Sequence, residues 1–184
     1  MLKIASPGVP DTYQGTEIWD FSLVDPDNRR PVDFDRRCLL LEEVDRLALK
    51  DLLTGWRSGA NKLRLLRAGL SLRAEAPALF TMGEYMPLDV EGTCADHVVA
   101  FARSRGTAAV MALAPRLGLK LLEGQAMPLV PAPSWRDTNL ILPHALTHRR
   151  WRNICTGEEI AGNRAVMLGA VLKDFPVGLL MSTG

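Results

Sequence analysis

A helical period of apolar and polar residues runs through residues 33–53. The apolar side of the predicted helix is formed by Leu40, Val44, Leu47 and Leu52. Most of the charged residues fall on the opposite side, as expected of an amphipathic helix. Asp33 or Asp35 is suited to cap the N-terminus of this helix, and Gly55 is suited to end it. A second amphipathic helix is predicted to begin near Asn61 and to end at Pro77.

After Pro77 the helical period fades, and short apolar runs alternate with Gly, Pro and Asp. We predict strands over residues 85–90, 97–103, 107–114, 138–142, 151–155, 165–172 and 177–181. Residues 117–133 fit either a pair of strands or an irregular loop. Several short strands separated by turn residues predict a compact antiparallel β-sandwich.

The pattern therefore divides the chain into two unequal parts. Residues 1–76 carry one short strand candidate and two helices, and a lone strand cannot close a core without partners. Residues 77–184 carry enough strands for a β domain. We predict an α+β chain in which residues 77–184 form the β-sandwich and residues 1–76 belong to something larger.

Length and charge restrict the class of protein. The chain has 184 residues, which is too few for a complete (β/α)8 barrel of about 250 residues. Its 22 Lys and Arg against 21 Asp and Glu give a formal charge of +1, so no nucleic acid partner is expected. No apolar run approaches the ~20 residues of a membrane span. Cys38, Cys94 and Cys155 are far apart and odd in number, which predicts free thiols and a cytoplasmic location.

Histidines and tryptophans offer few candidates for chemistry. His144 and His148 have the i, i+4 spacing of a helical zinc pair, but Pro143 next to them favours a surface loop. We predict no metal site and no cofactor. Trp135 and Trp151 fit either the core of the β domain or a flat platform for a sugar ring, and the core is the commoner role.

Two consecutive motifs near the N-terminus carry a family resemblance. PGVPDTYQGTE at residues 7–17 resembles the eighth-strand segment of the α-amylase superfamily, where Gly-x-Pro leads into a strand that ends in Tyr-x-Gly-x-Glu. IWDFSLVDPDNRRPVDF at residues 18–34 follows it and is similar to one branch of that superfamily, the maltooligosyl trehalose synthases.

The resemblance continues more loosely along nearly the whole chain. KLRLLRAGLSLRAEA at residues 62–76 resembles the eighth barrel helix of that family. GEYMPL at residues 83–88 and HVVAFAR at 97–103 resemble the entry into its C-terminal β domain, and WRDT at 135–138 and WRNICTG at 151–157 resemble later strands. The matched part is only the last portion of a much longer protein.

This resemblance implies a fold and an activity. Residues 1–76 would be the last strand–helix unit of an incomplete (β/α)8 barrel, followed by the sandwich. The family is a glucosylmutase of trehalose biosynthesis that converts the reducing-end α-1,4 bond of a maltooligosaccharide into an α,α-1,1 bond, through the retaining chemistry of paired carboxylates. Its nucleophile, its acid/base residue and a third Asp lie on earlier strands, and none of their motifs occurs here. We therefore expect no catalytic residue in this chain and no activity of the chain alone.

The same resemblance selects candidate binding residues and partners. Functional groups of a barrel project from the C-terminal ends of its strands and from the loops that follow. The residues so placed are Tyr13, Gln14 and Glu17 at the strand end and Asp25, Asp27, Arg29 and Arg30 in the loop. Such groups can hydrogen-bond sugar hydroxyls or stack on a pyranose ring. The expected partners are a maltooligosaccharide or longer glucan, bound by the complete enzyme, and the missing N-terminal barrel portion.

Three alternatives stay open. The DPDNRRP loop can be purely structural, with its carboxylates capping backbone amides and pairing with the arginines. The β domain can be a stand-alone carbohydrate-binding or interaction module. The chain can also be part of another α-amylase-type hydrolase, in which case Glu17 is a candidate acid/base residue, although DPDNRRPVD argues against this.

Overall fold

The computed structural model describes residues 1–23 and 25–183. The helices are α1 (Leu2–Ala5), α2 (Phe34–Glu43), α3 (Leu49–Thr54), α4 (Ala60–Glu75), α5 (Pro77–Met82) and α6 (Leu168–Val171). The strands are β1 (Glu84–Pro87), β2 (Asp89–Glu91), β3 (Val98–Arg105), β4 (Ala108–Pro115), β5 (Asn139–Ile141), β6 (Arg150–Asn153), β7 (Glu159–Ala161), β8 (Ala165–Met167) and β9 (Gly178–Ser182). Single 3-10 turns occupy Asp27–Arg29, Trp56–Ser58, Ala95–His97, Gly118–Lys120, Ala132–Trp135 and His144–Leu146.

Two antiparallel sheets form the second half of the molecule. The larger has the strand order β1-β3-β4-β9-β6-β7, and the smaller has the order β2-β5-β8. A buried cluster joins side chains of the larger sheet, such as Met111 and Trp151, to Leu140 and Val166 of the smaller one. The two sheets therefore enclose a common core, as predicted for the β domain.

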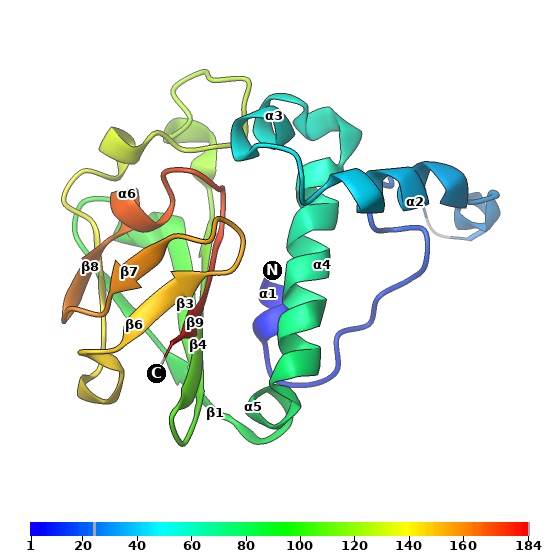
Figure 1. The fold of residues 1–184 in the computed structure, drawn as a ribbon. Helices are drawn as coiled ribbons and strands as arrows, with labels where there is room; N and C mark the ends of the chain where they lie inside the picture. The colour runs from blue at the N-terminus through cyan, green and yellow to red at the C-terminus, as the bar shows by residue number, and fades with distance from the viewer. Residues whose placement is uncertain (24, 184) are drawn as a thin grey trace.

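Helices cover the other face of the larger sheet (Figure 1). Strand β4 shows why: Met111 packs in the core between the sheets, whereas its neighbours Val110 and Ala112 pack with Phe80 of α5. Successive side chains of a strand point to opposite faces, so a strand that is buried on both faces is apolar at almost every position. The run Ala108–Pro115 has this composition.

The predicted helix over residues 33–53 is divided into α2 and α3. Asp33 caps α2, because its Oδ1 accepts a hydrogen bond from the Arg36 amide at 2.9 Å, and Gly55 ends α3, both as predicted. Helix α4 begins close to Asn61 as expected. Helix α4 also ends just before Pro77 as expected, but the helical part of the chain continues beyond it. The break is at Ala76, and Pro77 is the first residue of α5, where its fixed φ and missing N–H are favourable.

The predicted strands are confirmed in place but differ in extent. Residues 85–90 form β1 and β2, which belong to different sheets, and residues 168–171 turn into helix α6 after β8. Strand β7 is not among the predicted strands. Residues 117–133 form a loop, and residues 144–146 form a 3-10 turn, so the loop interpretation holds for both.

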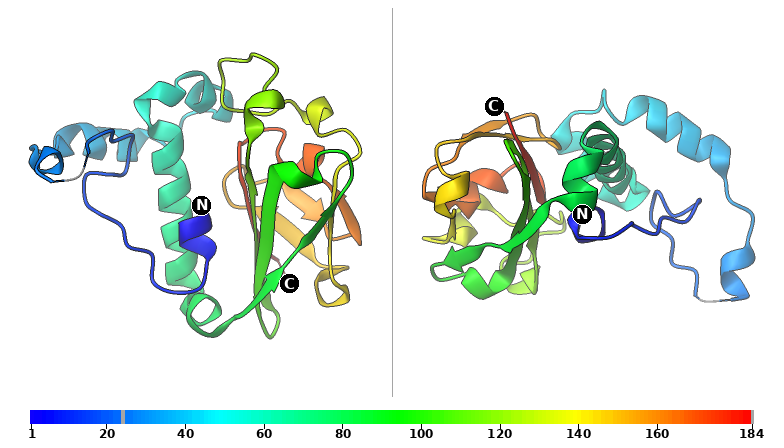
Figure 2. Two further views of the ribbon diagram at one scale, coloured as in Figure 1. Left: turned by 180° about the vertical axis from the view of Figure 1, so that it is seen from behind. Right: turned by 90° about the horizontal axis from the view of Figure 1, so that it is seen from below.

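The strand expected from PGVPDTYQGTE is not formed. Among the described residues of 1–76 the structure has no strand, and the one backbone hydrogen bond within residues 7–17 joins the Thr16 amide to the Tyr13 carbonyl. A barrel strand needs neighbours to receive its ladder of hydrogen bonds, and this segment has none beside it in the chain. It runs as an extended loop between α1 and α2, on the side of α4 away from the sheets (Figure 2).

Candidate functional site

The loop between α1 and α2 encloses a hollow of about 620 Å³ with the first turns of α2 and α4. Its lining is formed by Tyr13, Gln14, Gly15, Thr16, Ile18, Trp19, Asp20, Ser22, Leu23, Asn28, Arg30, Pro31, Val32, Asp33, Arg36, Arg37 and Lys62. It contains most of the motif that carries the family resemblance. We take it as the candidate site.

Trp19 is fixed in the wall of this hollow by contacts with the turn before α4. Its indole Nε1 donates a hydrogen bond to the Trp56 carbonyl at 2.6 Å, and the two rings meet edge to face with centroids 6.3 Å apart. The backbone of Ile18 and Trp19 crosses closely over Gly59, whose φ is 84°. Trp19 is half-buried, so part of its aromatic surface stays available to a ligand.

Lys62 of α4 contributes to the lining of the hollow. Its Nζ donates to the Ile18 carbonyl at 2.7 Å and lies 5.6 Å from the centroid of the Trp19 ring. Burial lowers the pKa of Lys62, with nearby Asp20 acting in the opposite direction. The lysine therefore joins α4 to the loop, 44 positions away in the sequence.

Glu17 and Arg37 form an ion pair beneath the loop. The Nε of Arg37 lies 3.1 Å from Oε2 of Glu17, and the two side chains are 15% and 26% exposed, Arg37 being the more buried. Glu17 Oε1 also accepts from the Gly15 amide at 3.1 Å, while Arg37 donates to the Gly15 and Asp33 carbonyls. Both charges are thus engaged in holding the Tyr13–Glu17 turn against α2.

The charged residues of the DPDNRRP loop pair mainly with one another. Arg29 pairs with Asp25, with 2.7 Å between Nη2 and Oδ2, and Arg30 pairs with Asp27. Asp27 also accepts a hydrogen bond from the Leu23 amide at 2.9 Å. Of these four residues, only Arg30 is in the lining of the hollow. This geometry agrees with the structural interpretation of Asp25, Asp27 and Arg29.

The structure thus brings together Tyr13, Gln14 and Arg30 from the predicted set and adds residues that the sequence did not indicate. Trp19 and Asp20 lie inside the motif at residues 18–34, so that motif could have indicated them. Lys62 comes from a distant helix, and no local pattern marks it. Hydrogen bonds from Ser22 hold the pKa of the Asp20 carboxyl below its ordinary value.

The hollow combines aromatic faces with hydrogen-bonding side chains. Tyr13 and Trp19 offer aromatic faces, Gln14 can donate and accept, and Arg30 offers a forked donor.

No cluster of three His, Cys, Asp or Glu side chains suited to a metal ion occurs among the described residues. Within the same residues, no helix is long and apolar enough to cross a membrane.

The tryptophans of the β domain do not contribute a sugar platform. Trp135 and Trp151 are both 0% exposed and belong to the core between the sheets. Their indole N–H groups have no hydrogen-bond partner within the described chain. The core interpretation of both residues is therefore confirmed.

Comparisons with known proteins agree with the motifs. No protein-family model matches the chain. Two curated proteins of Mycobacterium tuberculosis, from strains CDC 1551 and H37Rv, are named maltooligosyl trehalose synthase, and each is 37% identical over 181 residues. The match covers 98% of this chain and 20% of each relative, so the chain spans about a fifth of their length.

Solved structures lead to the same enzyme. A mutant of maltooligosyltrehalose synthase from Arthrobacter ramosus matches with a TM-score of 0.75 and 38% identity, over 99% of this chain and 21% of that one. A second crystal structure of maltooligosyl trehalose synthase matches with a TM-score of 0.68 and 29% identity, again over 99% and 21%. Over nearly its whole length, the chain is therefore similar in sequence and fold to the C-terminal part of maltooligosyl trehalose synthase.

Proposed function

We propose that this chain acts as the C-terminal part of a (1→4)-α-D-glucan 1-α-D-glucosylmutase, which forms trehalose-ended maltooligosaccharides. The observation that carries this proposal is the 37% identity over 98% of the chain to proteins named for that activity. In the proposal, the chain supplies one wall of a glucan site, and the rest of the longer enzyme supplies the catalytic carboxylates.

The side chains of the hollow support a holding role. Tyr13 and Trp19 would lie against pyranose rings, and Gln14 and Arg30 would bind sugar hydroxyls. Asp25, Asp27 and Arg29 would brace the loop that carries Arg30, because they pair within the loop. Glu17 would support the Tyr13 turn through Arg37. None of these roles requires a group to break a bond.

The surface of the N-terminal part supports contact with the rest of such an enzyme. Large apolar side chains between residues 9 and 39 are strongly exposed, namely Val9 at 92%, Tyr13 at 68%, Phe21 at 88%, Leu23 at 75%, Phe34 at 50% and Leu39 at 61%. Exposed apolar surface of this extent marks an interaction site. We propose that the preceding barrel portion covers it and makes residues 7–17 its last strand.

A chimera tests the proposal. The segment of the Arthrobacter ramosus enzyme that matches this chain is replaced by this chain, and the chimera is incubated with maltopentaose. An α,α-1,1 bond removes the reducing end, so we expect reducing ends to decrease with the chimera. They should stay constant with the isolated chain and with the enzyme that lacks the segment. A folded chimera that leaves the reducing ends unchanged would contradict the proposed function, and an active isolated chain would contradict the division of roles.

A further inference from the structure

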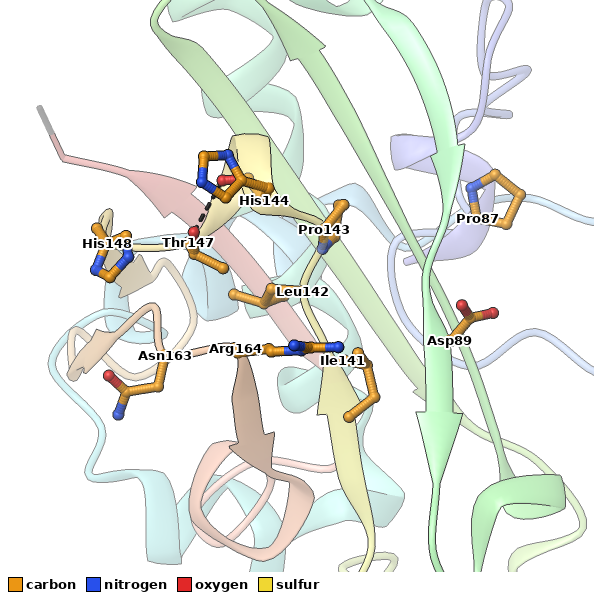
Figure 3. Close-up of a pocket in the computed structure, with 10 residues that line it drawn as sticks. All are labelled: Pro87, Asp89, Ile141, Leu142, Pro143, His144, Thr147, His148, Asn163 and Arg164. Carbon is orange, nitrogen blue, oxygen red and sulfur yellow. Dashed lines mark hydrogen bonds between the residues drawn. The ribbon is translucent and has the colours of Figure 1, made fainter.

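A second hollow, of about 580 Å³, lies in the β domain on the smaller sheet (Figure 3). It is lined by Pro87, Asp89, Ile141, Leu142, Pro143, His144, Thr147, His148, Asn163 and Arg164. Three separate segments meet there: the β1–β2 region, the end of β5 with the turn after it, and the residues just before β8. The hollow shares no lining residue with the candidate site between α2 and α4.

Backbone contacts hold these segments in place. The Leu142 amide donates to the Arg164 carbonyl at 2.8 Å, and the His148 amide donates to the Gly162 carbonyl at 2.7 Å. Leu142 and Leu146 anchor the turn in the core, at 2% and 0% exposed. The backbone positions that carry the polar side chains are therefore set by a packed scaffold, a common property of ligand sites.

His148 adds a local sign of constraint. Its φ is 64°, in the left-handed region, which costs a non-glycine residue about 1 kcal/mol or more. The hydrogen bond from its amide to Gly162 stabilises this conformation. As a result, the imidazole belongs to the same rim as the neighbouring Asn163 and Arg164 (Figure 3).

The polar side chains of this hollow have free hydrogen-bonding capacity. Within the described chain, none of the side chains of Asp89, His144, His148, Asn163 and Arg164 makes a hydrogen bond or ion pair with another residue. The loop at Asp25–Arg30 is different, because its charges are paired with each other. A ligand in the second hollow would thus meet donors and an acceptor that no protein group already occupies.

Charge and shape favour a neutral sugar. The positive charge of Arg164 is balanced by the negative charge of Asp89 in the same lining, which disfavours a phosphate or another anion. Pro87, Pro143 and Ile141 contribute apolar surface beside these polar groups. Apolar patches next to unoccupied donors and acceptors match the C–H faces and hydroxyls of a pyranose. In Figure 3 the Arg164 side chain extends across the hollow toward Ile141.

We propose that this hollow is a second glucan-binding site, which holds an α-1,4-glucan away from the reacting end. The choice of glucan rests on the proposed function, whereas the existence of a neutral-sugar site rests on the lining itself. The two hollows share no lining residue, so each can be tested by its own substitution.

Calorimetric titration of the isolated chain with maltoheptaose tests the site. We expect Arg164→Ala to weaken binding at one site at least tenfold, because a forked donor is lost, and Arg164→Lys to recover part of it. Arg105→Ala is the matched control, since Arg105 is also an exposed arginine, makes no contact with the hollow and should leave binding unchanged. Inorganic phosphate should not bind in a way that depends on Arg164.

Trp19→Ala distinguishes the two hollows. If Trp19→Ala removes all maltoheptaose binding and Arg164→Ala removes none, the glucan binds at the first hollow only and the inference is wrong. Absence of any maltoheptaose binding, or phosphate binding that depends on Arg164, overturns it as well. If Arg164-dependent binding persists while the chimera is inactive, the site stands and the proposed mutase function fails.

Discussion

Replacement of Gly59 by alanine tests how the wall of the first hollow is held. Gly59 has φ of 84° and lies where the Ile18–Trp19 backbone crosses the turn before α4. A Cβ at this position would be 2.6 Å from Ile18 Cβ and 2.9 Å from the Trp19 amide nitrogen. Both contacts are with atoms at or next to the backbone, so no change of rotamer can relieve them, and the crossing segment itself has to move.

The magnitude has two parts. Alanine in the left-handed region costs about 1 kcal/mol or somewhat more relative to glycine. Displacing the packed Ile18–Trp19 segment adds about 1–3 kcal/mol, as in other overpacked sites. Gly157 isolates the first part, because its φ is 80° and nothing lies within 4 Å of its added Cβ. We expect Gly157→Ala to cost about 1 kcal/mol and Gly59→Ala about 3 kcal/mol.

Thermal and urea unfolding measure both variants. For a chain of 184 residues, 1 kcal/mol corresponds to a shift in Tm of about 2–4 °C, so Gly59→Ala should lower Tm by about 6–12 °C. The near-ultraviolet circular dichroism of the Trp19–Trp56 pair should change in Gly59→Ala and stay unchanged in Gly157→Ala. A Gly59→Ala variant within 0.5 kcal/mol of Gly157→Ala would refute the proposed close crossing.

Three further outcomes are expected. Burial raises the pKa of the Cys155 thiol to about 12 from a reference of 9.0, so the stability that the protonated thiol contributes is present below pH 9 and falls by about 1.4 kcal/mol per pH unit between 9 and 12. The urea midpoint should therefore fall more between pH 8 and pH 10.5 in the wild-type chain than in Cys155→Ala, and equal decreases would contradict this. A thiol reagent at pH 8 should label one cysteine of the native chain, the exposed Cys38, and labelling of a buried cysteine at the same rate would contradict the burial. Glu17→Gln should cost about 1 kcal/mol through loss of the half-buried pair with Arg37, whereas Asp25→Asn, in an exposed pair, should change the free energy of unfolding by less than 0.5 kcal/mol; equal effects would refute the distinction.

The sequence predicted those elements whose pattern depends on local rules. Asp33 and Gly55 cap helices through backbone geometry that is local, and residues 108–115 are apolar at nearly every position because both faces of β4 are covered. The strand prediction was less successful over residues 165–172. This apolar run has no clear period, and its second half forms helix α6. Periodicity alone cannot separate a buried strand from a short buried helix, so tertiary packing decided that segment.

The candidate site was only partly predictable for a related reason. Tyr13, Gln14 and Arg30, which line the hollow, could be named in advance because the motif that contains them is continuous in the sequence. Lys62 reaches the same hollow from α4 through one hydrogen bond to Ile18, and this contact depends on how α4 packs against the loop. The pairing of Asp25 with Arg29 could be anticipated from their i, i+4 spacing, but spacing does not decide whether such a pair faces a ligand or solvent.

The electrostatics of the first hollow argue for holding a sugar and against cleaving one. A general acid for glycoside chemistry needs a carboxyl group whose pKa is raised by its surroundings. The lining carboxylate Asp20 has the opposite environment, since hydrogen bonds from Ser22 lower its pKa. Asp33 accepts from the Arg36 amide as a helix cap, and Glu17 is paired with Arg37. The ionised form of Asp20 is therefore favoured, while Asp33 and Glu17 are fixed by their hydrogen bonds and ion pair. This environment suits the proposed role of holding a glucan.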